Sequence, residues 1–295
     1  MVLDAQSLEI GYLKTLILSD QKAGHLNQSI AFCKLKGLDY DIVDIKNNYK
    51  FLTYIFDFLR FYPSFLLPKI PKKRYKAVVS AGSATYYLNK ALSKKLKVKS
   101  VAIMLPKGFR YKDFDYIVAQ SHDNPPNLNN IITIPVNLSY IDDKTDNKID
   151  TKDGIGIVIG GDNKIFSMQK DDIKRVLDEI FTKFPHKKKF VTTSRRTPKE
   201  IEELIESYDF DYKIIYSKTP DINPIPYFLK SCSDIYVTMD STSMLSEIKA
   251  NSSANLHIIE LESKIKDTKY HKLAKNVEQL KGKFDYKPYL ERINL

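Results

Sequence analysis

Short apolar runs alternate with helix-like stretches along the chain, and this alternation constrains the fold more than any other feature. In the first half, such runs occupy residues 15–20, 40–45, 77–82, 100–105 and 116–121. A basic amphipathic helix is predicted between two of them, over residues 83–97. Runs that are apolar throughout are typical of strands buried on both faces of a parallel sheet. The sequence therefore predicts an α/β fold.

The same alternation restarts after Tyr140–Asp153, a polar stretch without apolar periodicity. The later runs occupy residues 154–161, 189–194, 212–217, 234–241 and 256–261. A chain of 295 residues is longer than one hydrophobic core usually serves. We predict an N-terminal lobe over 1–140, a linker at 141–153 and a C-terminal lobe over 154–295, whose last helix can pack back on the first lobe. Two Rossmann-like lobes with parallel sheets would face a central cleft, beside the carboxyl ends of their strands.

The charge and the motif inventory narrow the set of partners. The formal net charge is +11, and most of the basic excess lies in residues 1–150. A basic surface attracts polyanions without choosing among them. RNA-binding, Walker and zinc signatures are absent, so we expect neither nucleic acid nor a metal site. The N-terminal segment lacks a secretory signal, which predicts a cytoplasmic location.

An aromatic apolar run is joined to a basic cluster in residues 51–76. Asp57, Arg60 and several prolines interrupt it well short of the roughly 20 apolar residues that a membrane span requires. Two interpretations stay open. The segment is either an ordinary packed helix followed by a solvated loop, or a contact with an anionic membrane surface through Phe51–Lys76. The second interpretation would place the protein peripherally on the inner face of the membrane.

The segment Ser19–Gln28 follows the first predicted strand and precedes a helix. Asp20 and His25 place two titratable groups beside a helix N-terminus, where either could act as a general base. The alternative is that they are turn, cap and surface residues. The further candidate binding residues of this half, which the family resemblance given below assigns to an acceptor, are Lys22, Gly24, Asn27, Gln28, Ser80, Gly82 and His122.

Strand ends in the second half carry residues suited to phosphate. Gly160 and Gly161 either let the backbone approach a phosphate or make a tight turn. Arg195 and Arg196, surrounded by hydroxyls, match a diphosphate, unless they are solvated loop residues. The candidate phosphate- and nucleotide-binding set is Gly160, Gly161, Ser194, Arg195, Arg196, Thr197, Asp240, Ser241, Ser243 and Glu247.

The last strand end of this kind leads from Asp240 into a helix. Ser241 and Ser243 can cap that helix and contact phosphate oxygens, which also gain from the helix dipole. Glu247 lies one turn further along. Its carboxylate suits the diol of a ribose, or else makes a capping-type contact.

Six segments in this order resemble the mitochondrial-fission Elm family, whose bacterial members are widely regarded as glycosyltransferases. The segments are K-A-G-H-x-N-Q at 22–28, S-A-G at 80–82, G-G at 160–161, T-S-R-R-T-P at 193–198, N-P-x-P-Y-F at 223–228 and D-S-x-S-M-x-S-E at 240–247. The resemblance runs from about residue 15 to residue 260. One departure is Gln21, because the first motif of the family commonly reads D-G-K.

The resemblance implies a GT-B-like fold in which the C-terminal lobe holds the donor nucleotide. It implies transfer of a sugar from a nucleotide-diphosphate donor to a cell-envelope or lipid-linked glycan or glycolipid. Neither a metal nor a further cofactor is expected, since protein cations and helix dipoles can neutralise the leaving group. His25, or else Asp20, would deprotonate the acceptor. The alternatives are a nucleotide-sugar epimerase of the same fold and a non-enzymatic membrane-recruitment protein.

Overall fold

The structure is a computed structural model that describes residues 13–45, 50–142 and 153–295. The chain forms two compact units. Unit 1 comprises Met1–Ala119, Pro126–Ile132 and Tyr289–Leu295, and unit 2 comprises Gln120–Pro125 and Thr133–Pro288. The predicted linker at 141–153 lies mostly in 143–152, outside the described residues, so the lobe boundary stays a prediction.

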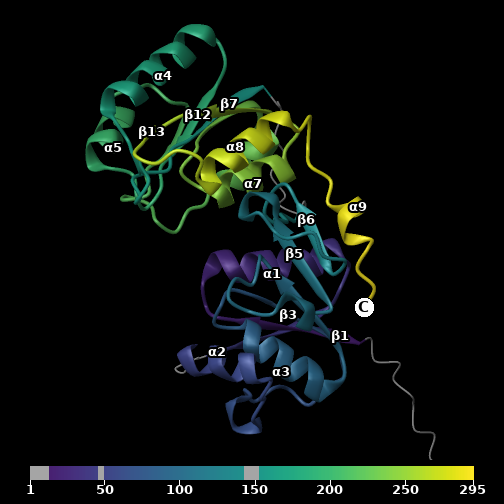
Figure 1. The fold of residues 1–295 in the computed structure, drawn as a ribbon. Helices are drawn as coiled ribbons and strands as arrows, with labels where there is room; N and C mark the ends of the chain where they lie inside the picture. The colour runs from purple at the N-terminus through teal and green to yellow at the C-terminus, as the bar shows by residue number, and fades with distance from the viewer. Residues whose placement is uncertain (1–12, 46–49, 143–152) are drawn as a thin grey trace, which may run out of the picture. The chain divides into compact units, whose positions relative to one another are not determined.

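The first sheet has six strands in the order β2-β1-β3-β4-β5-β6 (Figure 1). They are β1 (Lys14–Ser19), β2 (Tyr40–Asp44), β3 (Tyr75–Ala81), β4 (Lys99–Ile103), β5 (Tyr116–Gln120) and β6 (Ile131–Ile134). The pairings among β1 to β5 are all parallel. Strand β1 lies between β2 and β3, so the chain changes the direction in which it adds strands there. Open α/β sheets bind ligands at such switch points.

Helices cover both faces of the first sheet. They are α1 (Ala23–Leu35), α2 (Lys50–Leu59) and α3 (Tyr86–Leu96), with the 3₁₀ turns η1 (Ser64–Leu66), η2 (Tyr111–Asp113) and η3 (Ser121–Asp123). Leu16 and Leu18 of β1 join a core with Tyr87 and Leu92 of α3. Ile17 is also fully buried and points to the opposite face, which α1 covers (Figure 1). Burial on both faces explains the consecutive apolar residues 16–18 at the centre of the strand.

The end of the chain belongs to unit 1. Leu290 and Ile293 are buried. Their carbonyl oxygens both accept hydrogen bonds from Nζ of Lys36, each at 3.0 Å. These bonds tie the C-terminal segment to the end of α1.

The second sheet has five strands in the order β10-β9-β7-β11-β12, and its pairings are parallel. Its strands are β7 (Gly154–Val158), β9 (Lys189–Thr192), β10 (Tyr212–Ile214), β11 (Cys232–Thr238) and β12 (Asn255–Ile259). A separate antiparallel pair joins β8 (Phe166–Ser167) to β13 (Glu262–Ser263). The switch point of this sheet lies between β7 and β11.

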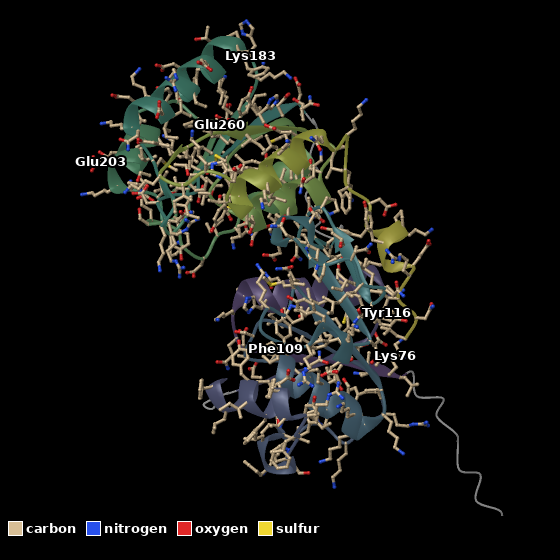
Figure 2. The ribbon with its side chains drawn as sticks, in the orientation of Figure 1. Lys76, Phe109, Tyr116, Lys183, Glu203 and Glu260 are labelled. Atoms are coloured by element: carbon tan, nitrogen blue, oxygen red, sulfur yellow. The ribbon has the colours of Figure 1, made fainter. Side chains whose placement is uncertain are left out.

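Unit 2 also has helices around its sheet. They are α4 (Lys170–Lys183), α5 (Lys199–Glu206), α6 (Ile225–Ser231), α7 (Thr242–Asn251), α8 (Lys269–Gln279) and the short α9 (Lys287–Leu290), which leads into the end of the chain. Ile157 of β7 packs in a core with Leu177 of α4 and Ile205 of α5. Lys183, at the end of α4, points into solvent (Figure 2).

The predicted α/β class with two parallel sheets is confirmed. A cleft shared by the two sheets stays a prediction. Within the described parts of the chain, every helix is too short or too polar to cross a membrane.

Candidate functional site

Asp20 and His25 meet at the switch point of the first sheet. Asp20 directly follows β1, and His25 lies in the first turn of α1. Nδ1 of His25 is 2.9 Å from Oδ2 of Asp20, whose side chain is only 6% exposed. A carboxylate in this position favours the tautomer with the proton on Nδ1, which leaves Nε2 as the proton acceptor. Asp20 therefore orients the imidazole, and His25 is the better placed of the two for general base chemistry.

Gly82 completes this cluster from the end of β3, on the other side of the switch point. Its φ of +91° lies in the region that favours glycine. A Cβ at Gly82 would lie 2.3 Å from Nδ1 of His25 and 3.0 Å from Asp20. Ser80, by contrast, is fully buried, and its hydroxyl accepts a hydrogen bond from Asn89 of α3. Within S-A-G, the glycine faces the cluster and the serine faces the core.

Several of the other acceptor-side candidates lie around the same turn. Nζ of Lys22 is exposed and lies 3.6 Å from Asp20. Gly24 has open space around it, and its carbonyl oxygen accepts from Nε2 of the buried Gln28. Asn27 is exposed on α1.

Two further residues, Gln21 and His122, concern the acceptor-side candidates of the sequence analysis. Gln21 has a φ of 63°, in the left-handed region, at the position where the motif it resembles commonly has glycine. His122 is buried on η3. It belongs to unit 2, whereas His25 belongs to unit 1. Its neighbour Ser121 accepts a hydrogen bond from Asn276 of α8.

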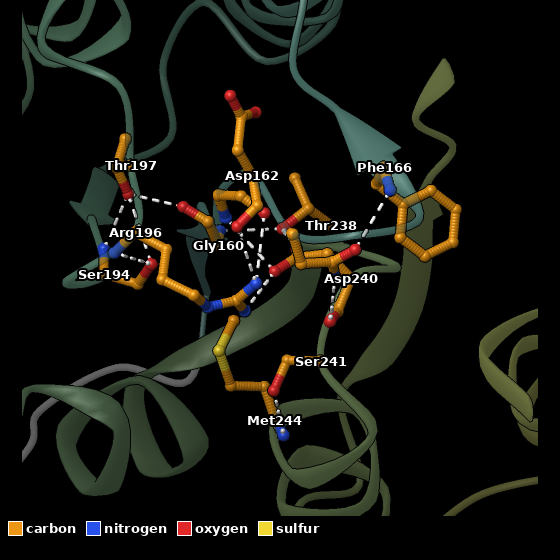
Figure 3. Close-up of polar contacts among 12 residues, drawn as sticks. Gly160, Asp162, Phe166, Ser194, Arg196, Thr197, Thr238, Asp240, Ser241 and Met244 are labelled. Atoms are coloured by element: carbon orange, nitrogen blue, oxygen red, sulfur yellow. Dashed lines mark hydrogen bonds and ion pairs between the residues drawn. The ribbon is translucent and has the colours of Figure 1, made fainter. Parts of the chain in front are cut away.

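The switch point of the second sheet is organised around the buried carboxylate of Asp240 (Figure 3). Oδ2 accepts the backbone N–H of Gly161 at 3.1 Å and pairs with the guanidinium of Arg196. Oδ1 accepts from the hydroxyl of Thr238 at 2.7 Å. That hydroxyl accepts in turn from the N–H of Gly160. Asp240 therefore binds the protein itself and is not free for a ligand.

The packing around Asp240 requires glycine at both positions of the pair after β7. A Cβ at Gly160 would lie 2.0 Å from Oδ1 of Asp240. A Cβ at Gly161 would lie 2.0 Å from the carbonyl oxygen of Arg196. Neither approach leaves room for a side chain. The sequence offered a phosphate contact or a tight turn as the reason for these glycines. The close approach of Asp240 and Arg196 is a third reason, and it holds whether or not a phosphate binds beside them.

The two arginines have different surroundings. Arg196 donates from Nη1 to the carbonyl oxygens of Gly161 and Asp162, at 3.2 and 3.1 Å, and from Nη2 to Asp240. Arg195 is exposed, and within the described residues its guanidinium has no hydrogen bond or ion pair. Ser194 and Thr197 close the turn between them through the N–H of Ser194, which donates to Oγ1 of Thr197. The turn is held rigidly while one arginine stays available.

Arg195 borders a groove of about 460 Å³ within unit 2. The residues that line it are Ser194, Arg195, Thr197, Lys199, Glu202, Glu203, Glu206, Tyr216, Ser217 and Lys218. Lys199 and Lys218 also line it, but they pair with Glu203 and Glu206. Ser217 donates its hydroxyl to Glu202. The sequence prediction missed this side of the groove, although Lys199 directly follows the motif at 193–198. It also missed Thr238, two residues before Asp240.

Helix α7 begins beside Asp240. Ser241 is its N-cap and accepts from the N–H of Met244 (Figure 3). Ser243 lies exposed in the first turn. Glu247, one turn further, is half-buried, and its carboxylate has no hydrogen bond or ion pair among the described residues. Burial raises the pKa of Glu247. A partly buried carboxylate of this kind is available to a hydroxyl-bearing ligand.

Comparison with known proteins gives one family and several solved structures. Residues 23–290 match the family model described as mitochondrial fission ELM1. No curated protein matches the sequence. The structure is similar to a putative UDP-N-acetylglucosamine 2-epimerase from Listeria monocytogenes, with 8% identity over 95% of this chain and 94% of that one and a TM-score of 0.49. It is also similar to MurG from Acinetobacter baumannii, with 8% identity over 94% and 98% and a TM-score of 0.44. Similarities this low describe the fold alone.

Proposed function

This chain belongs to the mitochondrial fission ELM1 family, and on that premise we propose that it is a glycosyltransferase. The donor is a nucleotide-diphosphate sugar bound by unit 2, and the acceptor is a hydroxyl of a cell-envelope or lipid-linked glycan. His25 of unit 1 is the general base. Protein groups replace a metal ion in neutralising the leaving group.

The observation that carries the proposal is the available guanidinium of Arg195 on a rigid turn. Arg196 and Asp240 fix the backbone of that turn through hydrogen bonds to the glycine pair. A guanidinium matches two phosphate oxygens at once. Because the turn is already ordered, little conformational entropy is lost when a diphosphate binds.

Helix α7 supports the same proposal from the other side of the switch point. The first amides of a helix have no intrahelical acceptors, and they attract anions. Glu247 lies one turn into this helix with an unpaired carboxylate, as a ribose diol would require. The amides at the start of α7 suit the diphosphate of a nucleoside diphosphate, and the carboxylate of Glu247 suits its ribose.

The proposed step balances as follows. Nε2 of His25 takes the proton of the acceptor hydroxyl, and the acceptor oxygen forms a bond to the anomeric carbon of the sugar. The bond between that carbon and the diphosphate oxygen breaks, and the nucleoside diphosphate leaves with the electron pair. Arg195 and the amides at the start of α7 stabilise the charge that develops on it. Asp20 stabilises the imidazolium.

A thermal-shift screen of nucleoside diphosphates tests the donor half. One nucleotide should raise the unfolding temperature, because ligand that binds only the folded state stabilises it. The substitution Arg195→Ala should weaken that nucleotide roughly 10- to 100-fold, since hydrogen bonds to a charged group contribute about 1.5–3 kcal/mol. Arg175→Ala is the matched control, because Arg175 is an exposed arginine on α4 that pairs with Asp172.

Three results would count against the proposal. Stabilisation by no nucleotide would favour a recruitment protein. Equal losses in the two arginine variants would remove Arg195 from the site. Release of an isomerised nucleotide sugar, without transfer to any acceptor, would indicate an epimerase.

A further inference from the structure

Helix α2 is amphipathic in the reverse of the usual sense. Its polar residues Thr53 and Asp57 are buried, at 2% exposure each. Phe51 and Phe58 on the outer side are 76% and 71% exposed. A surface helix normally turns its apolar stripe to the core and its polar face to water. The described residues of unit 1 therefore leave the apolar stripe of α2 exposed.

An ion pair fixes this orientation. The side chain of Lys90 on α3 is fully buried and pairs with Asp57, and Asp113 lies 3.7 Å from it. Phe109 packs against Tyr54 of α2, with ring centroids 4.7 Å apart. Rolling α2 to bury its phenylalanines would leave the buried charge of Lys90 without Asp57, which is strongly unfavourable. The exposed stripe is thus a stable feature of the fold.

The exposed apolar surface continues from α2 into the next turn. We call it the α2 patch, and it consists of Phe51, Leu52, Ile55, Phe58, Leu59, Phe61 and Phe65. Thirteen large apolar side chains are exposed in the described residues, and seven of them are in this patch. The five members on α2 recur at the spacing of one helix face. A concentration of this kind marks an interaction surface, whereas isolated exposed apolar residues do not.

The charge around the patch is positive. Residues 50–76 include seven Lys and Arg and one acidic residue, Asp57, which is buried against Lys90. The guanidinium of Arg110 lies over the ring of Phe58, 5.3 Å from its centroid. Lys69 and Lys72 are exposed just beyond the patch. The exposed charges of this segment therefore have one sign.

From this surface we infer that the α2 patch inserts into the interface of a membrane that contains anionic lipid. Phenylalanine, leucine and isoleucine have no polar group that needs a partner, so acyl chains can cover them fully, while the surrounding cations meet lipid headgroups. Phenylalanine is enriched at protein interfaces as well, so the rings alone do not choose the partner. The exposed charges of one sign beside the patch favour a surface of anionic lipid. A second copy of the chain, docked patch to patch, would bring like charges of the two copies together, which is unfavourable. The inference rests on unit 1 alone and does not depend on the proposed reaction.

Flotation of the full chain with lipid vesicles tests the inference. The vesicles contain either phosphatidylcholine alone or an equal mixture of phosphatidylcholine and phosphatidylglycerol. The chain should float with the mixed vesicles and much less with the neutral ones. The double substitution Phe51→Ser with Phe65→Ser should lower the partition coefficient by roughly tenfold for each ring. Both side chains are more than 75% exposed, so the variant keeps its core.

A matched control replaces two exposed isoleucines of unit 2, Ile222→Ser with Ile265→Ser, which are 48% and 53% exposed. It should float like the unchanged chain. Charge reversal at Lys69 and Lys72 should reduce flotation with the mixed vesicles only, because it acts through the headgroup charge.

Three outcomes would overturn the inference. One is that the chain fails to float with either kind of vesicle. Another is that the phenylalanine variant and the isoleucine control float equally. The last is a dimer of the unchanged chain in sedimentation velocity that the phenylalanine variant loses, since the α2 patch would then join two copies.

Discussion

Replacing Gly161 by alanine tests whether the close approach of two loops organises unit 2. The new Cβ would lie 2.0 Å from the carbonyl oxygen of Arg196, a backbone atom. That oxygen accepts the N–H of Asp162 at 3.2 Å, and Arg196 returns hydrogen bonds to the carbonyl oxygens of Gly161 and Asp162. Ordinary contact begins at 3.4 Å, so the two loops must separate by about 1.4 Å, which weakens all three bonds.

The cost follows from these contacts. Inserting a methyl group into a packed site costs about 1–3 kcal/mol. Each weakened hydrogen bond adds about 1 kcal/mol or less. We therefore expect the free energy of unfolding of unit 2 to fall by about 4 kcal/mol, which lowers its unfolding midpoint by roughly 8–16 °C for a unit of this size.

Gly24→Ala is the matched control. No atom lies within 4 Å of a Cβ at Gly24, which is in the first turn of α1. Alanine favours a helix over glycine by up to about 1 kcal/mol, so this variant should be as stable as the unchanged chain or slightly more stable.

Scanning calorimetry of both variants gives the midpoints, and hydrogen exchange of residues 154–165 locates the change. Because the chain has two units, calorimetry can show separate transitions. The packing argument fails if Gly161→Ala keeps the midpoint of the unchanged chain. It also fails if the exchange of residues 154–165 stays as slow as before.

Three further predictions concern single side chains. His25→Gln and Asp20→Asn should each lower kcat about 100-fold or more, because a general base acts on the acceptor proton. The KM for the donor should change little in steady-state transfer assays. A rise in the donor KM alone would contradict this role. Because burial raises the pKa of Glu247 above its unfolded value, the folded state loses stability as the pH rises through these pKa values. Glu247→Gln should therefore be more stable than the unchanged chain at neutral pH, but not at a pH below the pKa of Glu247 in the unfolded state. The prediction fails if the difference in unfolding temperature between the two proteins does not change with pH. Gln21→Gly should raise the free energy of unfolding by up to about 1 kcal/mol in urea titrations, since a φ of 63° is unfavourable for glutamine.

The sequence predicted the sheets well. The runs at 15–20, 77–82 and 100–105 correspond to β1 (Lys14–Ser19), β3 (Tyr75–Ala81) and β4 (Lys99–Ile103). Strands buried on both faces leave an apolar signature that needs no knowledge of their neighbours. The predicted helix 83–97 likewise contains α3.

The sequence could not predict which polar side chains turn inward. Lys90 lies in a helix predicted to be basic and amphipathic, yet it is fully buried, because Asp57 and Asp113 reach it from other segments. The sequence does not distinguish Arg195 from Arg196. Arg196 is the arginine that pairs with Asp240, a residue distant in sequence, whereas Arg195 stays exposed. Partners distant in sequence decide these cases, and a local pattern contains no record of them.

The segment Tyr289–Leu295 affects the order in which the protein can be assembled. Strand β1 of unit 1 is made before any part of unit 2, but Lys36 obtains the carbonyl oxygens of Leu290 and Ile293 only after residues 133–288 have been made. All of α4 to α8 is made in between. Unit 2 can therefore fold on the nascent chain before Tyr289–Leu295 of unit 1 has been made. A stop codon just before Tyr289 would leave unit 2 intact, yet it would remove Tyr289–Leu295 from unit 1.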